Sequence, residues 1–192
     1  MNIQIKQRAQ VTYSLKNFTI LLAEDYEFMQ NLIGGMLRAF GVGNIMVCSS
    51  GREAIELLQI TEAQSRSGNI KGIDLILADW MMPEGSGLEL IDWVRNHKSD
   101  RIRFTPLILV SAFTSEDVII AARDHGANEA LVKPVSGEKG AARILSVIDT
   151  PRPFVKTATY FGPDRRRKDK PFQGEDRRKM TAEQIITHDE RL

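Results

Sequence analysis

The chain has 192 residues, of which 42% are hydrophobic, and its 26 Lys and Arg against 25 Asp and Glu give a formal net charge of +1. This composition is that of an ordinary globular protein, and it excludes a disordered chain, a collagen-like chain and a small disulfide scaffold. The single cysteine, Cys48, excludes an intrachain disulfide and a cysteine-rich zinc site. No apolar run approaches the about 20 residues that a membrane span needs, and no secretion signal is visible. We therefore expect a cytoplasmic protein without a membrane partner.

Charge is unevenly distributed along the chain. Residues 1–149 carry 15 basic and 18 acidic side chains, whereas residues 150–192 carry 11 basic and 7 acidic ones. The change coincides with Pro151 and Pro153, which cannot continue a helix. We predict an N-terminal extension over 1–16, a folded domain over 17–149 and a basic C-terminal arm over 150–192.

Short apolar runs alternate within the folded domain with segments whose apolar residues recur every three or four positions. Each apolar run is followed by one such segment. In chain order the runs and their segments are 18–23 and 28–40, 45–48 and 54–58, 73–78 and 88–94, 107–110 and 118–122, and 129–132 and 144–148. Nearly continuous apolar runs are typical of strands buried on both faces, and the longer period is typical of amphipathic helices. The pattern predicts a doubly wound α/β domain with five parallel strands and helices on both faces.

Polar residues stand where the predicted strands end. Such sheets bind ligands in the crevice beyond the carboxyl ends of their strands. The residues at these ends are Glu24, Asp25, Asp79, Ser111 and Lys133. Three neighbouring carboxylates repel one another unless a cation joins them, and Mg²⁺ is the hard divalent ion that suits oxygen ligands. Asp79 can then act as a nucleophile toward phosphorus, with Ser111 and Lys133 on the phosphoryl oxygens.

Short motifs surround these residues in a fixed order. They are Ala-Glu-Asp at 23–25, Asp-Trp-Met-Met-Pro at 79–83, Gly87, Ser111-Ala112, Gly126-Ala127 and Lys133-Pro134. In their order and spacing, residues 17–149 resemble the receiver domain of bacterial two-component response regulators. The resemblance implies a CheY-like domain with the flavodoxin-like strand order 2-1-3-4-5, followed here by an extended C-terminal arm.

The resemblance also implies a role for each matching residue. Asp79 would accept a phosphoryl group from a sensor histidine kinase, a phosphotransfer protein or a small phosphodonor. The implied Mg²⁺ ligands are Glu24, Asp25, Asp79 and the backbone carbonyl of Met81. The implied phosphate-binding groups are Ser111, Lys133 and the backbone of Ala112, and the bond between Lys133 and Pro134 is expected to be cis.

Two departures from the family pattern affect the expected mechanism. The family usually carries Tyr or Phe three residues before the lysine, and this chain has Ala130 there. Either Phe113 substitutes for that ring, or coupling runs through the Ser111 loop alone. The two positions that tune phosphate lifetime in the family are occupied by Met81 and Phe113. Because neither side chain can orient an attacking water, we expect slow autodephosphorylation.

The basic arm contains a two-copy Gly-x-Asp-Arg-Arg repeat at 162–166 and 174–178. Its residues are too few for a conventional output domain, so we expect a receiver without one. We expect one of three roles for the arm: a solvated segment, a docking segment that folds on a partner or on the dimer-related domain with apolar anchors at 153–155 and 160–161, or a nucleic-acid-binding segment. The last would use Arg165, Arg166, Arg167, Arg177 and Arg178. It is the least favoured, because acids intersperse the arginines and no recognition module accompanies them. Residues 181–186 are predicted to form one short helix.

The leading hypothesis is a signalling switch. Mg²⁺-dependent phosphorylation of Asp79 would change the face formed by the fourth helix, fifth strand and fifth helix of the domain, which would bind a downstream protein or a second copy. The alternatives are nucleic-acid binding through the arm and a phosphatase or phosphotransferase. The enzyme alternative would follow the haloacid-dehalogenase pattern, which has a second acid two residues after the nucleophilic Asp. This chain has Met81 at that position, which argues against such an enzyme. We therefore expect no enzyme beyond a phosphoacceptor that phosphorylates itself from a donor and has at most weak autophosphatase activity.

Overall fold

A computed structural model describes residues 14–68, 71–113, 115–134, 137–165 and 185–186. Its main sheet has five strands, which are β1 (Thr19–Ala23), β2 (Asn44–Cys48), β3 (Leu75–Asp79), β4 (Leu107–Ser111) and β5 (Glu129–Val132). All four pairings are parallel and the spatial order is β2-β1-β3-β4-β5. The predicted doubly wound sheet with order 2-1-3-4-5 is confirmed.

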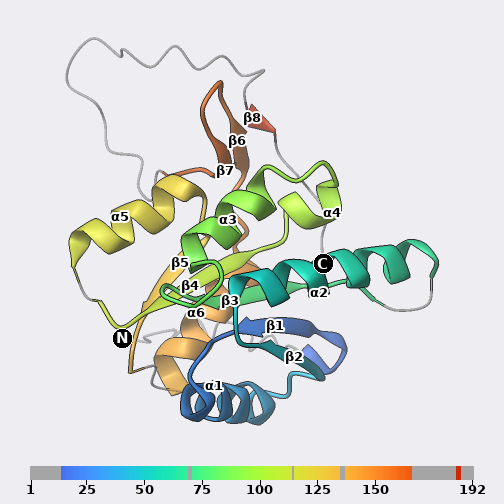
Figure 1. Cartoon of the computed structure of the whole chain (residues 1–192), viewed down its shortest axis with the longest axis vertical. Coiled ribbons are helices and arrows are strands. Elements are labelled where there is room, and N and C mark those ends of the chain that lie inside the picture. The colour runs from blue at the N-terminus through green and yellow to red at the C-terminus, as the bar shows by residue number, and fades with distance from the viewer. Residues whose placement is uncertain (1–13, 69–70, 114, 135–136, 166–184, 187–192) are drawn as a thin grey trace, which may run out of the picture.

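Helices cover both faces of this sheet (Figure 1). One face packs against α1 (Glu27–Ala39) and α6 (Gly137–Asp149), and the other against α2 (Gly51–Arg66), α3 (Gly87–Arg95), the short α4 (Asp100–Arg103) and α5 (Glu116–His125). Successive side chains of β1 alternate between the two cores, since Leu21 belongs to one and Leu22 to the other. Burial on both faces is the reason why this strand is continuously apolar in the sequence.

The turn after β3 is held close to the sheet by its local sequence. Ser86 caps α3, with its hydroxyl accepting from the Glu89 amide while the Glu89 carboxylate accepts from the Ser86 amide. Gly87 follows, and its amide donates to the Trp80 carbonyl at 3.0 Å. A Cβ atom at Gly87 would overlap the carbonyl oxygen of Asp79. Only glycine therefore lets α3 begin this close to the end of β3.

The C-terminal arm contributes a second, smaller sheet that the sequence patterns did not predict. Strands β6 (Phe154–Lys156) and β7 (Phe161–Pro163) form an antiparallel hairpin, and β8 (Ile185–Ile186) pairs with the other edge of β6. Figure 1 shows the hairpin at one end of the molecule, beyond α3 and α4. The helix predicted over 181–186 is wrong at residues 185–186, which form β8, and its remaining residues lie outside the described ranges.

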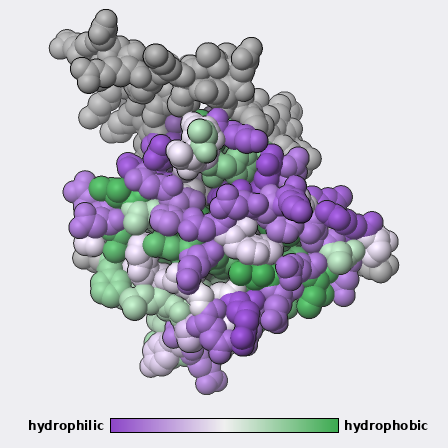
Figure 2. Space-filling view, turned by 45° about the horizontal axis from the view of Figure 1, so that its top comes forward, coloured by the Kyte–Doolittle hydropathy of each residue, from purple (hydrophilic) through white to green (hydrophobic). Residues whose placement is uncertain are grey.

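Most of the surface is mixed in character. On the face drawn in Figure 2, apolar side chains lie in patches among polar ones. The exposed large hydrophobic residues are Tyr26, Phe28, Leu32, Val47, Ile60, Met81, Phe113, Ile119 and Ile120. Within the described ranges, every helix is too short or too polar to cross a membrane.

Candidate phosphoacceptor site

The strand register brings the predicted site residues to one edge of the sheet. Ala23 at the end of β1 pairs with Ala78 of β3, so Glu24 and Asp79 leave neighbouring strands at the same level. Asp79 in turn pairs with Val110, which places Ser111 one residue further along β4. Ser111 pairs with Val132, the residue before Lys133. The carboxyl ends of four segments therefore meet at one crevice, as the sequence predicted.

Three carboxylates gather in this crevice. Glu24, Asp25 and Asp79 each offer an oxygen, and these oxygens lie within 4.8 Å of one another. Glu24 is only 1% exposed and Asp79 8%, whereas Asp25 is exposed to solvent. The arrangement combines two buried acids with one acid at the mouth of the crevice.

Lys133 bridges the two buried acids. Its Nζ donates to Glu24 Oε1 at 2.9 Å and lies 2.9 Å from Asp79 Oδ1. Burial raises the pKa of Glu24, and the hydrogen bond from Lys133 only partly offsets this effect. Burial alone would lower the pKa of Lys133, but its hydrogen bonds to Glu24 and Asp79 outweigh burial and raise the pKa overall. One ammonium is thus shared between carboxylates that would otherwise repel each other.

The donor set fits a hard divalent cation. Glu24 Oε2 is buried and has no hydrogen-bond donor within the described part of the chain, although Lys133 Nζ lies 2.7 Å away as an ion pair. This ammonium offsets one of the three carboxylate charges, and a divalent cation would balance the remaining two. Three carboxylates in mutual reach are the hard oxygen ligands that Mg²⁺ binds. These residues therefore fit the ion that the sequence predicted.

Ser111 lies deeper than its predicted partners on the same loop. It is buried, and its Oγ accepts from the Phe113 amide at 3.0 Å, while its carbonyl accepts from the Lys133 amide at 2.7 Å. Ala112 and Phe113 are both exposed. The bond between Lys133 and Pro134 is cis, as expected. The Ser111 hydroxyl thus links β4 directly to the loop that leads into α5.

Two further predicted positions flank the crevice. Met81, whose carbonyl was predicted as a metal ligand, is 59% exposed at its side chain. Ala130 is partly buried and packs against the core on the α3 and α5 side. A methyl group therefore occupies the place where the family usually has a ring, and Phe113 is an exposed residue.

The sequence patterns missed residues that hold the crevice in shape. Gln30 donates from its Nε2 to the Glu24 carbonyl at 2.6 Å. Arg52 at the start of α2 forms an ion pair with Glu84 in the β3–α3 loop, and its amide donates to the Glu84 carbonyl at 2.9 Å. Gln30 lies in the first part of the helix that follows Asp25, and this nearness is the only signal that the sequence offered. The Arg52 contact joins segments far apart in the chain and carries no local signature.

The fold and the acidic crevice define a receiver-type α/β protein. The family model for the response regulator receiver domain matches residues 20–145. The chain belongs to this family, as a CheY-like receiver domain.

Individual proteins agree with this assignment. The chain is 31% identical over 130 residues to the chemotaxis protein CheY of Pseudomonas aeruginosa, which covers 68% of this chain and 95% of that protein. It resembles the structure of the Vibrio cholerae chemotaxis protein CheY4, with a TM-score of 0.56, 25% identity, and coverage of 68% of this chain and 98% of that one. A CheX-CheY-BeF3-Mg complex from Borrelia burgdorferi shares the fold, with a TM-score of 0.56, 22% identity, and coverage of 68% and 88%.

Proposed function

We propose that this protein is a phosphoacceptor response regulator whose Asp79 is phosphorylated in a Mg²⁺-dependent reaction. The observation that carries the proposal is the crevice itself, in which Glu24, Asp25 and Asp79 approach one another and Lys133 bridges two of them. The phosphodonor would be the phosphohistidine of a sensor kinase or phosphotransfer protein, or a small acyl phosphate. We place this chemistry in the cytoplasm.

The transfer is a substitution at phosphorus. A carboxylate oxygen of Asp79 forms a bond to the phosphorus while the P–N bond of the donor breaks, and the electron pair of that bond returns to the imidazole nitrogen, which takes up a proton. Lys133 already lies 2.9 Å from Asp79 Oδ1, so its ammonium is placed to move onto a phosphoryl oxygen. The Ser111 hydroxyl and the Ala112 amide would donate to the other oxygens.

Mg²⁺ would be held by Glu24, Asp25, Asp79 and the backbone carbonyl of Met81. When bound, it would offset the negative charge of the phosphoryl oxygens and of the three carboxylates. Asp25, the exposed member of the set, stands at the mouth of the crevice and lets the ion exchange with solvent. The protein would turn over no external substrate and would at most hydrolyse its own acyl phosphate slowly.

The output would be a change in protein contacts. The face formed by α5, β5 and α6 adjoins the Ser111 loop and exposes Ile119 and Ile120 of α5. Phosphate on Asp79 that draws in Ser111 would shift this face between two arrangements. A downstream protein or a second copy of the chain would bind one of them.

Treatment of the full chain with acetyl phosphate and Mg²⁺ tests the proposal. We expect intact-mass measurement to show the addition of one phosphoryl group to the wild type and none to Asp79→Asn. Asp92→Asn is a matched control, because Asp92 is a partly exposed acid of α3 outside the crevice. Omission of Mg²⁺ should prevent the modification. Equal modification of Asp79→Asn and the wild type would overturn the assignment of the site.

A further inference from the structure

The hairpin of β6 and β7 is anchored to the receiver domain by aromatic rings. Phe154 and Phe161 pack against Phe104, which follows α4, with ring centroids 4.8 Å and 5.2 Å from the Phe104 ring. The guanidinium of Arg103 lies 4.6 Å from the centroid of Phe161. Phe154 and Val155, two anchors predicted from the sequence, are buried, and they are buried against their own domain.

A buried arginine ties this anchor to two loops of the receiver. Arg95 at the end of α3 is 4% exposed, and its guanidinium lies 5.1 Å from the centroid of Phe154. Its guanidinium donates at 2.7–2.9 Å to four acceptors, which are the carbonyls of Gly126, Arg103 and Thr105 and the side-chain oxygen of Asn128. The hairpin therefore rests on the same group that fixes the loop after α5.

The C-terminal end of α5 receives the closest hairpin contacts. Gly126 ends α5 in the left-handed conformation, with φ 101°. A Cβ atom on Gly162 of the hairpin would lie 2.9 Å from Gly126 Cα and 2.7 Å from the hydroxyl of Tyr160. Arg165, which follows the hairpin, pairs with Asp124 of α5 at 3.1 Å. The first copy of the Gly-x-Asp-Arg-Arg repeat thus supplies the glycine and the first arginine of this docking contact.

Helix α5 connects the hairpin to the phosphoacceptor crevice. Its N-terminal end follows the Ser111 loop, and its ten residues span about 15 Å. Ala122 is its one buried residue, so little packing along its length fixes its position. At the far end it is held by the hairpin and by His125, whose Nδ1 lies 2.7 Å from Asp92 of α3. The C-terminal end of α5 is therefore tied both to the hairpin and to α3.

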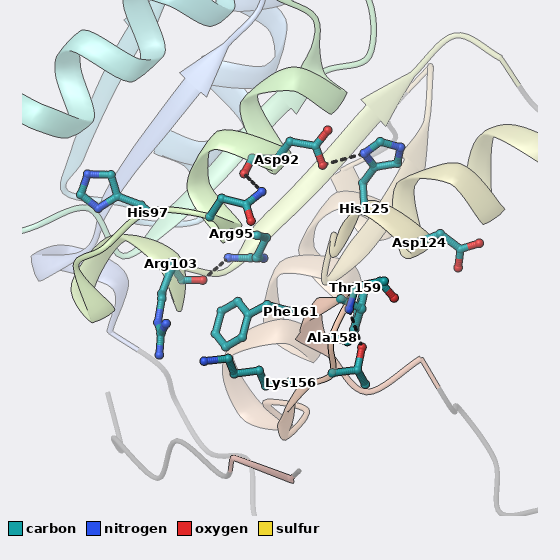
Figure 3. Close-up of a pocket in the computed structure, with 13 residues that line it drawn as sticks. Asp92, Arg95, His97, Arg103, Asp124, His125, Lys156, Ala158, Thr159 and Phe161 are labelled. Atoms are coloured by element: carbon teal, nitrogen blue, oxygen red, sulfur yellow. Dashed lines mark hydrogen bonds and ion pairs between the residues drawn. The ribbon is translucent and has the colours of Figure 1, made fainter. Parts of the chain in front are cut away.

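The hairpin is not packed tightly on every side. A cavity of about 550 Å³ lies between α3, the end of α5 and the hairpin, lined mostly by polar and charged residues. Figure 3 shows Arg103 and Lys156 on one side of this cavity, and Asp92, His125 and Asp124 on another. The side of the hairpin that faces this cavity is therefore not packed against the receiver domain, whereas Phe154 and Val155 are buried.

We propose that the hairpin is the intramolecular target of the phosphorylation switch, a step that rests on the function proposed above. In this arrangement the docked hairpin holds the C-terminal end of α5. When a phosphoryl group on Asp79 draws Ser111 away from the Phe113 amide, the Ser111 loop moves α5, and the hairpin contacts at Gly126 and Asp124 weaken. Docking and phosphoryl binding then oppose each other, and by linkage each weakens the other by the same factor.

The coupling between hairpin docking and phosphoryl binding can be measured by titrating the full chain with BeF3⁻ and Mg²⁺. Binding is monitored by the fluorescence of Trp80, which lies beside Asp79. Gly162→Ala, which pushes the hairpin away from Gly126, should raise the affinity for BeF3⁻ about fivefold or more. Gly35→Ala is a matched control, because a Cβ atom there meets no atom within 4 Å, and its affinity should equal that of the wild type. Asp124→Asn, which weakens the pair with Arg165 of the arm and also the local pair with Arg123, should raise the affinity to a smaller extent.

Hydrogen exchange of the wild-type chain gives the reciprocal measurement without a mutation. The amides of Thr157 and Asp164 donate to the carbonyls of Tyr160 and Pro153 within the arm, both at 2.8 Å. Their exchange should accelerate about fivefold or more when BeF3⁻ and Mg²⁺ bind. Unchanged exchange together with wild-type affinity in Gly162→Ala would overturn the inference and leave the proposed function intact. Weaker binding by Gly162→Ala would overturn its direction, and no BeF3⁻ binding at all would overturn both proposals.

Discussion

Replacement of Arg95 by methionine tests how the end of α3 supports the rest of the fold. Methionine keeps an unbranched apolar stem of similar reach but removes all donors. In the wild type, burial lowers the pKa of Arg95 to about 9, so the guanidinium stays charged at neutral pH. Its charge is balanced by carbonyl and amide oxygens that surround it. The variant would leave these acceptors without the donor that satisfies them.

The size of the effect follows from the groups left behind. Three backbone carbonyls, those of Arg103, Thr105 and Gly126, lose the Arg95 hydrogen bond, while Asn128 Oδ1 still accepts from the Leu107 amide at 3.0 Å. A buried polar group without a partner destabilises a protein by about 1–3 kcal/mol. Arg95 lines the cavity beside the hairpin, so water can reach part of this site. We expect Arg95→Met to lower the free energy of unfolding by about 3–5 kcal/mol.

Urea unfolding monitored by circular dichroism measures this difference in the free energy of unfolding. The matched control is Arg101→Met, since Arg101 is exposed and makes a hydrogen bond to Ser65 at 2.9 Å. Its change should stay within about 0.5 kcal/mol of the wild type. If Arg95→Met were as stable as Arg101→Met, the claim that this guanidinium satisfies buried carbonyls would be wrong.

Three further outcomes are expected. Burial raises the pKa of the Cys48 thiol to about 12, so a thiol reagent should modify the urea-unfolded chain and leave the native chain unmodified at neutral pH. Burial alone would raise the pKa of Asp124, but Arg123 and Arg165 outweigh it and hold the pKa below 3.8. Its contribution to stability is therefore present above this value and lost as the pH falls through the lower folded-state pKa, so the stability difference between wild type and Asp124→Asn should shrink at acidic pH. Because Met81 and Phe113 cannot orient water, phosphate on Asp79 should decay slowly in the presence of Mg²⁺, and a lifetime of seconds would contradict this expectation.

The main sheet and the crevice could be predicted because their signals are local. A strand buried on both faces must be apolar at nearly every position, as Leu75–Asp79 is up to its last residue, and that last residue is the acid of the site. Parallel strands then bring their carboxyl ends to one edge, so Glu24, Asp79 and Lys133 meet without any further information.

The hairpin could not be predicted in the same way. Phe154 was recognisable as an apolar anchor, but its partner Phe104 lies in a different segment, and nothing in either local sequence joins them. Arg95 has the sequence signature of a surface cation in the last turn of a helix. It is buried because two segments, the α4–β4 connection and the loop after α5, bring three carbonyls to the same point. The four residues of α4 are too few to show a helical period.

The position of Phe113 decides between the two coupling routes that Ala130 left open. Phe113 is 51% exposed as a residue, and its amide donates to Ser111 Oγ, so its backbone contacts the hydroxyl that we propose as the switch. Phe113→Ala keeps that amide. We therefore expect BeF3⁻ and Mg²⁺ to change hydrogen exchange of the Val118 amide, which bonds to Ser115 at the start of α5, equally in wild type and Phe113→Ala. Loss of this response in Phe113→Ala, with BeF3⁻ still bound, would show that the ring replaces the missing aromatic residue at position 130.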